Sequence, residues 1–280
     1  MNQKWQKHGF IRLLRNWSGL LGLFLVTVYV TVAIFAETLA LFPPNEQHPT
    51  DRLQPPGPVY RLGADEFGRD LLSRLIFGAR NSLKVALTSV AAATLAGVTI
   101  GLLAAYIGGL SDNVIMRVID LLFAFPAILL ALFIAAVLGP GERNTIIAIA
   151  VVYLPIFARV GRAAALDVKD REFVDAARSL GAGHLRLIGR HILPNATAPI
   201  IVQVTLALSW AILTEASLSF LGLGVIPPAP SWGSMLSESR VLMELAPWTV
   251  IMPGLAIMFA ILGFNLLGDG LRDVLDPKLQ

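Results

Sequence analysis

Residues 175–195 read DAARSLGAGHLRLIGRHILPN, and they lie between two long apolar stretches of a 280-residue chain. The wider segment 166–194 contains nine charged residues. A charged side chain at the centre of a bilayer costs about 3 kcal/mol, so inserting all nine would cost on the order of 25 kcal/mol. We therefore expect this charged segment, taken as residues 166–195, to lie in water while its neighbours cross a membrane.

The composition of the chain is that of a membrane protein. Hydrophobic residues make up 55% of it and charged residues 15%, whereas soluble domains contain about 25% charged residues. A helix that spans a bilayer needs about 20 mostly apolar residues. Six stretches meet this requirement, at approximately 17–36, 85–107, 118–138, 144–165, 196–221 and 245–268. The sequence thus predicts an all-α, multi-pass protein with six transmembrane helices.

The distribution of Lys and Arg predicts the orientation of these helices, because cytoplasmic loops are enriched in both. With a cytoplasmic N-terminus, the inner segments carry 14 of these residues and the outer segments carry eight. Six of the eight lie between Arg52 and Lys84, where acidic residues are interleaved with them. We expect both termini and the charged segment to be cytoplasmic.

These assignments divide the chain into three parts. Residues 1–37 are expected to form the N-terminal tail and first transmembrane helix, residues 38–84 a periplasmic segment, and residues 85–280 a five-helix core. The basic N-terminus also fits a signal peptide, but the apolar run exceeds the about 7–15 residues usual there. An uncleaved anchor is favoured, and residues 4–16 fit a short amphipathic helix on the inner surface.

The predicted periplasmic segment has two halves. Residues 43–58 are too rich in proline for a regular helix or sheet. Residues 62–83, LGADEFGRDLLSRLIFGARNSL, place apolar side chains on one helical face and predict an interfacial helix leading into the second span. Asp70 and Arg74 have the i,i+4 spacing of a helical ion pair.

Within the charged segment, the sequence predicts two short helices at an angle. Asp170 is a candidate N-cap for the first helix. Its apolar face would be formed by Phe173, Ala176, Ala177 and Leu180. A second helix would present Leu185, Ile188 and Ile192 on one face and end at Pro194.

Glycines at 181 and 183 separate the two helices, and Gly181 suits a left-handed C-terminal cap. Physical reasoning leaves two roles open for the resulting apolar face. It can lie on lipid headgroups, as basic amphipathic helices do, or it can bind another protein whose backbone the small alanines allow to approach closely.

The sequence DAARSLGAG…ILPNATAPI resembles the EAA loop of ABC importer permeases. That motif has an acidic residue, two alanines, a glycine four residues on and a later Ile-Leu-Pro. Aspartate here replaces the commoner glutamate. LGADEFGRDLLSRLIFGARNSL, SFLGLGVIPPAPSWGSML and FNLLGDGLRDVLDPKL resemble the C-type permease of dipeptide, oligopeptide and nickel importers. The resemblance extends over nearly the whole chain.

This resemblance implies a type I ABC importer permease of a bacterial cytoplasmic (inner) membrane. The implied partners are a homologous second permease, two ABC ATPase subunits and an extracytoplasmic solute-binding protein. In such importers the EAA loop docks on an ATPase and transmits its movement. Matched to this sequence, the residues implied in coupling are Phe173, Asp175, Ala176, Ala177, Leu180, Gly181, Gly183, Ile192 and Pro194.

The chain has no G-x-x-x-x-G-K-[ST] phosphate-binding loop, so we expect a partner to hydrolyse ATP. We expect no enzyme activity, catalytic residue, cofactor, metal site or nucleic-acid partner for this chain. The cargo stays open among a dipeptide, an oligopeptide, glutathione, an opine and a nickel chelate. The rival hypotheses are a secondary transporter driven by an ion gradient and a membrane scaffold without transport.

Several residues inside the spans have two interpretations each. Gly97 and Gly101 form a GxxxG pair that allows close helix contact, within the subunit or with a second permease. Pro126 and Pro155 lie inside predicted spans, where each acts as a gating hinge or as a static kink. Arg117 and Asp120 have the i,i+3 spacing of a local ion pair.

Glu215 is the carboxylate deepest within a late span. An ionisable residue in a membrane span is a functional hypothesis by default, and here it would line the substrate path. In the rival transporter, it would carry protons. The structural alternative is a hydrogen bond to Ser217, Ser219 or a neighbouring helix, because buried polar groups generally find partners.

Overall fold

The computed structural model describes residues 16–275, most of which are helical. The helices, in chain order, are α2 (Trp17–Ile34), α3 (Ala36–Leu39), η1 (Pro49–Asp51), α4 (Leu71–Ile107), α5 (Gly109–Phe123), α6 (Ala127–Leu138), α7 (Glu142–Lys169), α8 (Glu172–Ser179), α9 (His184–Arg186), η2 (Leu187–Ile192), η3 (Leu193–Asn195), α10 (Thr197–Phe220), α11 (Trp232–Ser239), η4 (Arg240–Leu242) and α12 (Trp248–Leu275). Within residues 16–275, the β-structure is limited to an isolated bridge between Ala64 and Asp70. The all-α prediction is confirmed.

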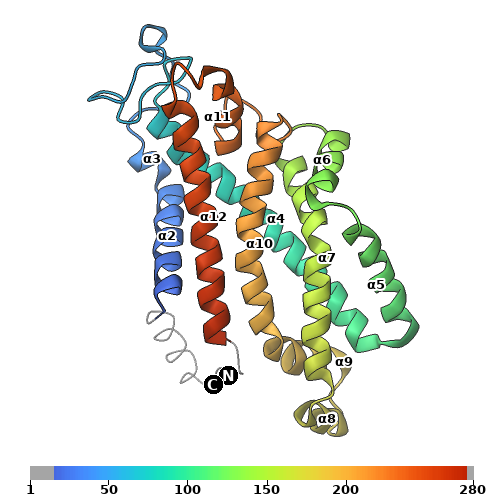
Figure 1. Cartoon of the computed structure of the whole chain (residues 1–280). Helices are drawn as coiled ribbons and strands as arrows, with labels where there is room; N and C mark the ends of the chain where they lie inside the picture. Colours follow the sequence, from blue (N-terminus) through green and yellow to red (C-terminus); the bar gives the residue numbers. More distant parts are fainter. Residues whose placement is uncertain (1–15, 276–280) are drawn as a thin grey trace.

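Five of these helices, α2, α4, α7, α10 and α12, are long and apolar enough to cross a membrane, and α5 with α6 would make a sixth span. In Figure 1, α2, α12, α10 and α7 stand side by side while α4 crosses obliquely behind them. Helix α4 packs against α7, and α12 packs against both α2 and α10.

Close packing of α4 on α7 depends on small residues. A Cβ atom at Gly97 would lie 2.6 Å from the carbonyl oxygen of Leu154, and one at Gly101 would lie 2.7 Å from the backbone nitrogen of Arg162. Both distances are shorter than van der Waals contact, so only glycine allows the two backbones to approach this closely. The GxxxG pair thus packs within the subunit.

Helix α4 begins earlier than expected, and the predicted interfacial helix is not separate from the second span. The 37 residues from Leu71 to Ile107 form one helix, because no proline interrupts them and Gly78 is tolerated within a helix. The expected Asp70–Arg74 pair is also absent. Asp70 instead caps α4, its carboxylate accepting hydrogen bonds from the backbone nitrogen and hydroxyl of Ser73 at 2.8 and 2.6 Å.

The third predicted span is broken. Its residues belong to α5 and α6, whose axes differ by 87°. Pro126 is the N-cap of α6, and a proline restricts the residue before it to extended conformations, which ends α5. By contrast, α7 continues as one helix through Pro155, which is buried.

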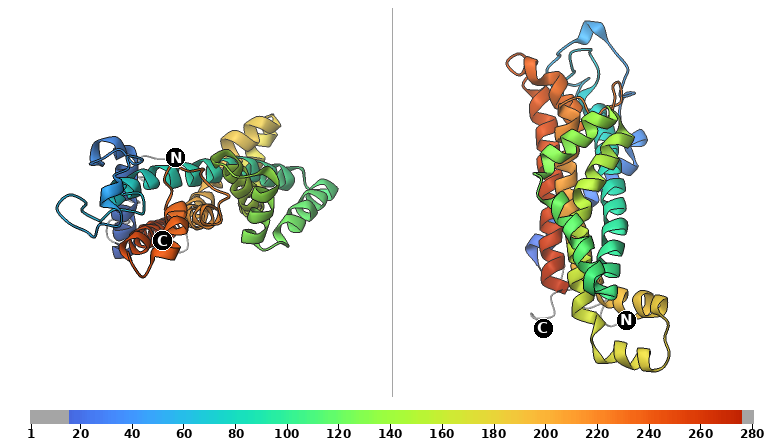
Figure 2. Two further views of the ribbon diagram at one scale, coloured as in Figure 1. Left: turned by 90° about the horizontal axis from the view of Figure 1, so that it is seen from above. Right: turned by 90° about the vertical axis from the view of Figure 1, so that its right-hand side faces the viewer.

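The two ends of the bundle are formed by different elements (Figures 1 and 2). Helices α8 and α9 lie at one end, together with the start of α2 and the end of α12. The amide nitrogen of Asn16 donates to the carboxylate of Asp273 at 2.7 Å, which ties these last two together. The segment 40–70 and α11 cover the opposite end. The helix predicted at residues 4–16 and the basic Lys278 lie outside the described residues, apart from Asn16.

Candidate functional site

The charged segment forms a small folded unit at the end of α7. Helix α8 lies beyond the ends of the spanning helices, across the direction of the bundle (Figure 2). Its single buried residue, Val174, belongs to the same apolar cluster as Leu187 and Ile192 of η2. This packing gives the segment a fixed shape rather than that of a loose loop.

Three large apolar side chains of this unit face solvent. Phe173 is 41% exposed, Leu180 88% and Leu185 89%. Ala176 is also exposed and Ala177 is half-buried. Three large apolar side chains exposed on one small unit beyond the spanning helices make this unit a candidate interaction surface.

Details of the first helix differ from the expectation. Asp170 ends α7, and Arg171 occupies the N-cap of α8 without a side-chain hydrogen bond. Asp175 forms an exposed ion pair with Arg178 at 2.9 Å. Gly181 has φ +84, the left-handed conformation expected of a C-terminal cap.

The second predicted helix is irregular, and its expected apolar face is wrong. Leu185 points to solvent whereas Ile192 is buried, so they do not share a face. Gly183 is the N-cap of the short α9, and the chain then forms a π-helical turn before Pro194, which lies exposed in η3. Proline lacks an N–H and crowds the carbonyl four residues earlier, and a widened π turn accommodates both effects.

Two contacts anchor the charged segment to the end of α4. The hydroxyl of Tyr106 and Nδ1 of His184 share a hydrogen bond of 2.6 Å. The ammonium group of Lys169 donates to the carbonyl oxygen of Ala105 at 3.1 Å. The charged segment is therefore held by α4 as well as by its direct connection to α7.

Glu215 is fully buried and hydrogen-bonded. Its carboxylate accepts hydrogen bonds from Ser82 of α4 at 2.8 Å and from Ser219 of α10 at 2.7 Å. Ser217, the other sequence candidate, donates instead to the carbonyl oxygen of Leu213. The carboxylate thus links two helices, and its place in a substrate path stays a prediction.

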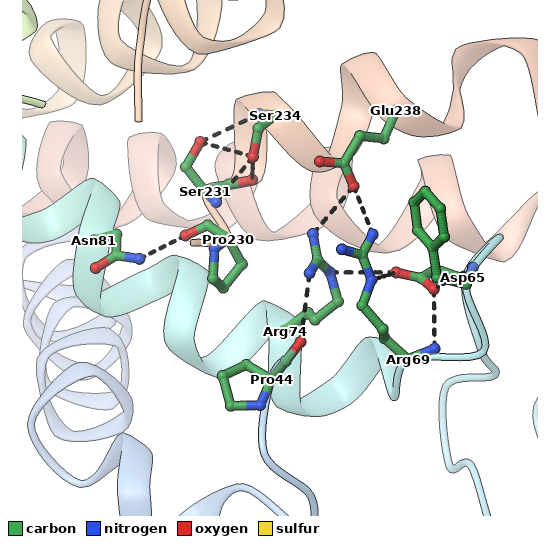
Figure 3. A network of polar contacts seen from close by, with 10 residues as sticks. Pro44, Asp65, Arg69, Arg74, Asn81, Pro230, Ser231, Ser234 and Glu238 are labelled. Atoms are coloured by element: carbon green, nitrogen blue, oxygen red, sulfur yellow. Dashed lines mark hydrogen bonds and ion pairs between the residues drawn. The ribbon is translucent and has the colours of Figure 1, made fainter. Parts of the chain in front are cut away.

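A charged network at the opposite end joins segments far apart in sequence (Figure 3). Arg69 and Arg74 are both buried, and each pairs with Asp65, at 2.5 and 3.4 Å, and with Glu238 of α11, at 2.9 and 3.1 Å. Burial raises the pKa of the neighbouring Glu66, and the charges of Glu238 and Asp65 raise it further.

Sequence reasoning missed this network, although both of its parts were visible. Its two arginines and Asp65 belong to the motif at residues 62–83, and Glu238 follows the motif at residues 219–236 by two positions. Asn81 also donates to the carbonyl oxygen of Pro230 at 2.6 Å (Figure 3). The sequence did contain a signal for such a network: arginines lie within a segment predicted to be helical, and charges that become buried require partners.

The expected ion pair between Asp120 and Arg117 is replaced by a contact between two helices. The carboxylate of Asp120 accepts from Arg159 of α7 at 2.7 Å. Among residues 16–275, no cluster of His, Asp and Glu has the arrangement of a metal site.

Comparison with known proteins identifies the family. The profile described as "Binding-protein-dependent transport system inner membrane component" matches residues 97–280. The profile "N-terminal TM domain of oligopeptide transport permease C" matches residues 5–56.

Curated relatives align over nearly the full chain. The dipeptide transport system permease protein DppC of Alkalihalophilus pseudofirmus is 47% identical, covering 98% of this chain and 90% of the relative. The di/tripeptide transport system permease protein DppC of Pseudomonas aeruginosa is 48% identical, with coverages of 95% and 89%. The glutathione transport system permease protein GsiD of Pectobacterium atrosepticum is 45% identical, with coverages of 92% and 86%.

Among solved structures, an inward-facing structure of the MetNI methionine ABC transporter matches with a TM-score of 0.60. The match covers 73% of this chain and 97% of that chain, and at 18% identity it supports the fold alone. Together with the spanning helices, the profile and the curated relatives establish that the chain belongs to the inner-membrane components of binding-protein-dependent transport systems, as a multi-pass permease subunit of an ABC importer.

Proposed function

We propose that this permease forms half of the channel of an ATP-driven peptide importer, and that α8 and α9 dock on an ATPase subunit. The observation that carries the proposal is the position of α8. It lies beyond the bundle, is directly continuous with the long α7 through the two residues Asp170 and Arg171, and exposes Leu180 and Leu185. A force applied to this surface acts directly on a helix long enough to span the membrane.

The cargo we infer is a short peptide. The relatives described above carry names that assign them to dipeptides, di/tripeptides and glutathione. Their identities of 45–48% over more than nine-tenths of this chain support the same class of cargo here. A nickel chelate remains the alternative that the sequence motifs allow.

The remaining subunits follow from the same assignment. A homologous second permease would cover apolar side chains that stand exposed on α5 and α6, such as Leu121 and Phe133. The solute-binding protein would dock on the end formed by segment 40–70 and α11. In this arrangement α8, Asn16 and Leu275 would lie on the cytoplasmic side, which is also the side that the distribution of Lys and Arg favours for them.

Cross-linking tests the docking surface directly. The natural chain contains no cysteine, so Leu180→Cys introduces a single attachment point for a short thiol–amine cross-linker. We expect a product with the ATPase subunit in membranes from cells that express the whole importer. Cross-linking to lipid or to the other permease alone, with no ATPase product, would overturn the proposal.

A matched glycine pair tests coupling. Gly181→Val places a β-branched side chain at φ +84, where such residues are strained, and we expect ATP hydrolysis without peptide uptake. Gly189→Val is the control, because Gly189 has ordinary φ and open space around it. Normal uptake by Gly181→Val, or uptake that survives ATP depletion in the wild type, would contradict the proposed mechanism.

A further inference from the structure

Helix α5 is attached to the protein by charges more than by apolar packing. Of its 15 residues, only Asp112 and Ile119 are buried. Its large apolar side chains are more than half exposed in Leu110, Val114, Val118 and Leu121. Within this subunit, a helix that buries a carboxylate and exposes its leucines depends strongly on that carboxylate for its position, and the exposed leucines are left for the second permease proposed above.

Two arginines on α7 hold α5. The carboxylate of Asp112 accepts two hydrogen bonds from Arg162, from Nε at 2.6 Å and from Nη2 at 2.5 Å. Eight residues further along α5, Asp120 accepts from Arg159 at 2.7 Å. The guanidinium of Arg159 also lies 4.1 Å from the centre of the Phe123 ring. Because the bidentate pair fixes orientation as well as distance, the two contacts together define how α5 lies along α7.

Both ends of α5 are joined to its neighbours by bends. Gly108, the N-cap, and Gly109, the first residue of α5, have φ +70 and +61, and a Cβ at either position would meet no atom within 4 Å. The 87° break to α6 follows it. Neither connection forces α5 to keep the direction of α4 or α6, so its position is set by its packing on α4 and α7 and by the ion pairs with α7.

Helix α7 is also the helix that carries the charged segment. Arg159 and Arg162 lie about two to three turns before Lys169, where α7 ends and the chain enters α8. The side chains of Asp112 and Arg162 are 11% and 34% exposed, so separating this pair leaves a largely buried carboxylate without its partner, which is strongly disfavoured. The Arg159–Asp120 pair is about half exposed and contributes less. When α7 moves, the least costly response is therefore for α5 to move with it.

We propose that Arg159 and Arg162 are positioning residues that transmit the movement of α7 to α5. Pulling on α8 then shifts both helices together, and the exposed apolar face of α5 shifts relative to α10. This inference rests on the proposed function, because it assumes that an ATPase moves α8. It adds a defined route, from α8 through α7 and two Arg–Asp pairs to α5.

Uptake and ATP hydrolysis by the complete importer in proteoliposomes test this route. For Arg162→Gln we expect ATP hydrolysis near the wild-type rate and uptake reduced about tenfold or more, within the range of measured coupling between sites. Exchange of the pair, Asp112→Arg with Arg162→Asp, should restore most of the lost uptake. Glu142→Gln is the control, because it breaks the Lys84–Glu142 pair of 2.6 Å elsewhere on α7, and uptake should be unchanged.

Spin-label distances separate transmission from simple loss of structure. Since the natural chain has no cysteine, labels can be placed at the exposed Val118 on α5, Ser179 on α8 and Trp210 on α10. In the wild-type importer we expect nucleotide to change both the 118–210 and the 179–210 distances. In Arg162→Gln the 179–210 change should persist and the 118–210 change should be lost.

Three results would overturn the inference: wild-type uptake by Arg162→Gln, an unchanged 118–210 response in that variant, or no recovery in the exchanged pair. If Arg162→Gln does not assemble into the importer, the double variant Asp112→Arg with Arg162→Asp provides the test. Assembly and uptake by the double variant support the route, and their loss refutes it. A wild-type importer in which nucleotide moves neither distance would instead contradict the proposed function.

Discussion

The indole N–H of Trp232 donates a hydrogen bond to the backbone carbonyl of Leu75 at 3.0 Å, across 157 positions of sequence. One turn further along α4, a Cβ atom at Gly78 would lie 2.8 Å from the same indole ring. The ring also stacks on Tyr29 of α2, with centroids 5.1 Å apart. Trp232 thus joins α11 to two spanning helices, and it fits only because residue 78 has no side chain.

Gly78→Ala is therefore expected to destabilise the protein by about 1–3 kcal/mol, because overpacking forces the indole ring or α11 to shift. Thermal unfolding of the purified importer, followed by tryptophan fluorescence, measures the effect. Gly254→Ala in α12 is the matched control, since a Cβ there meets no atom within 4 Å, and it should be neutral or slightly stabilising. Equal effects of the two substitutions would contradict this account of Trp232.

Removal of Glu238 should destabilise the end of the bundle that carries α11. Glu238→Gln leaves the buried Arg69 and Arg74 with Asp65 as their only carboxylate partner in the network, and breaking a buried pair costs about 3–5 kcal/mol. Because Glu238 is partly exposed, we expect a loss of stability near the lower end of this range. Glu37→Gln in the exposed Arg80–Glu37 pair is the control and should cost at most about 1 kcal/mol. A similar melting temperature for both variants would show that the network contributes little.

Two substitutions distinguish the roles of Glu215. Glu215→Ala leaves the buried hydroxyls of Ser82 and Ser219 without their acceptor and creates a cavity, so we expect a loss of about 2–4 kcal/mol. Glu215→Gln retains one acceptor oxygen, and its amide nitrogen can donate to the other serine hydroxyl, so this variant should keep both stability and uptake close to wild type. If Glu215→Gln instead raises the KM for peptide without lowering stability, the carboxylate contacts the cargo and the structural role is wrong.

The stability of the protein should respond to pH through Glu66. Its pKa is higher in the folded protein, chiefly because of burial and then because of the charges of Glu238 and Asp65. A carboxyl group with a raised pKa favours the folded state when protonated and opposes it when ionised. Glu66→Gln should therefore raise the melting temperature slightly at pH 7, and this gain should disappear as the pH falls through the pKa of Glu66. A gain that is independent of pH would have another cause.

Features with a local physical cause could be predicted from the sequence. The six apolar stretches are visible because transfer to a bilayer depends on composition over about 20 residues. The position of α8 beyond the spanning helices agrees with the nine charges of the segment 166–195, and the left-handed conformation of Gly181 follows from its place after a helix. Each of these is set by residues within a few turns of one another.

The tertiary structure alone decided which groups are partners. Asp120 has Arg117 one turn away yet pairs with Arg159, and Arg74 has Asp70 one turn away yet pairs with Asp65 and Glu238. It also decided that Ile192 is buried while Leu185 is exposed. Spacing along a helix shows which side chains can meet, but the burial of a charge and the approach of a second helix determine which contact has the lowest free energy. Those quantities arise only when separate segments of the chain pack together.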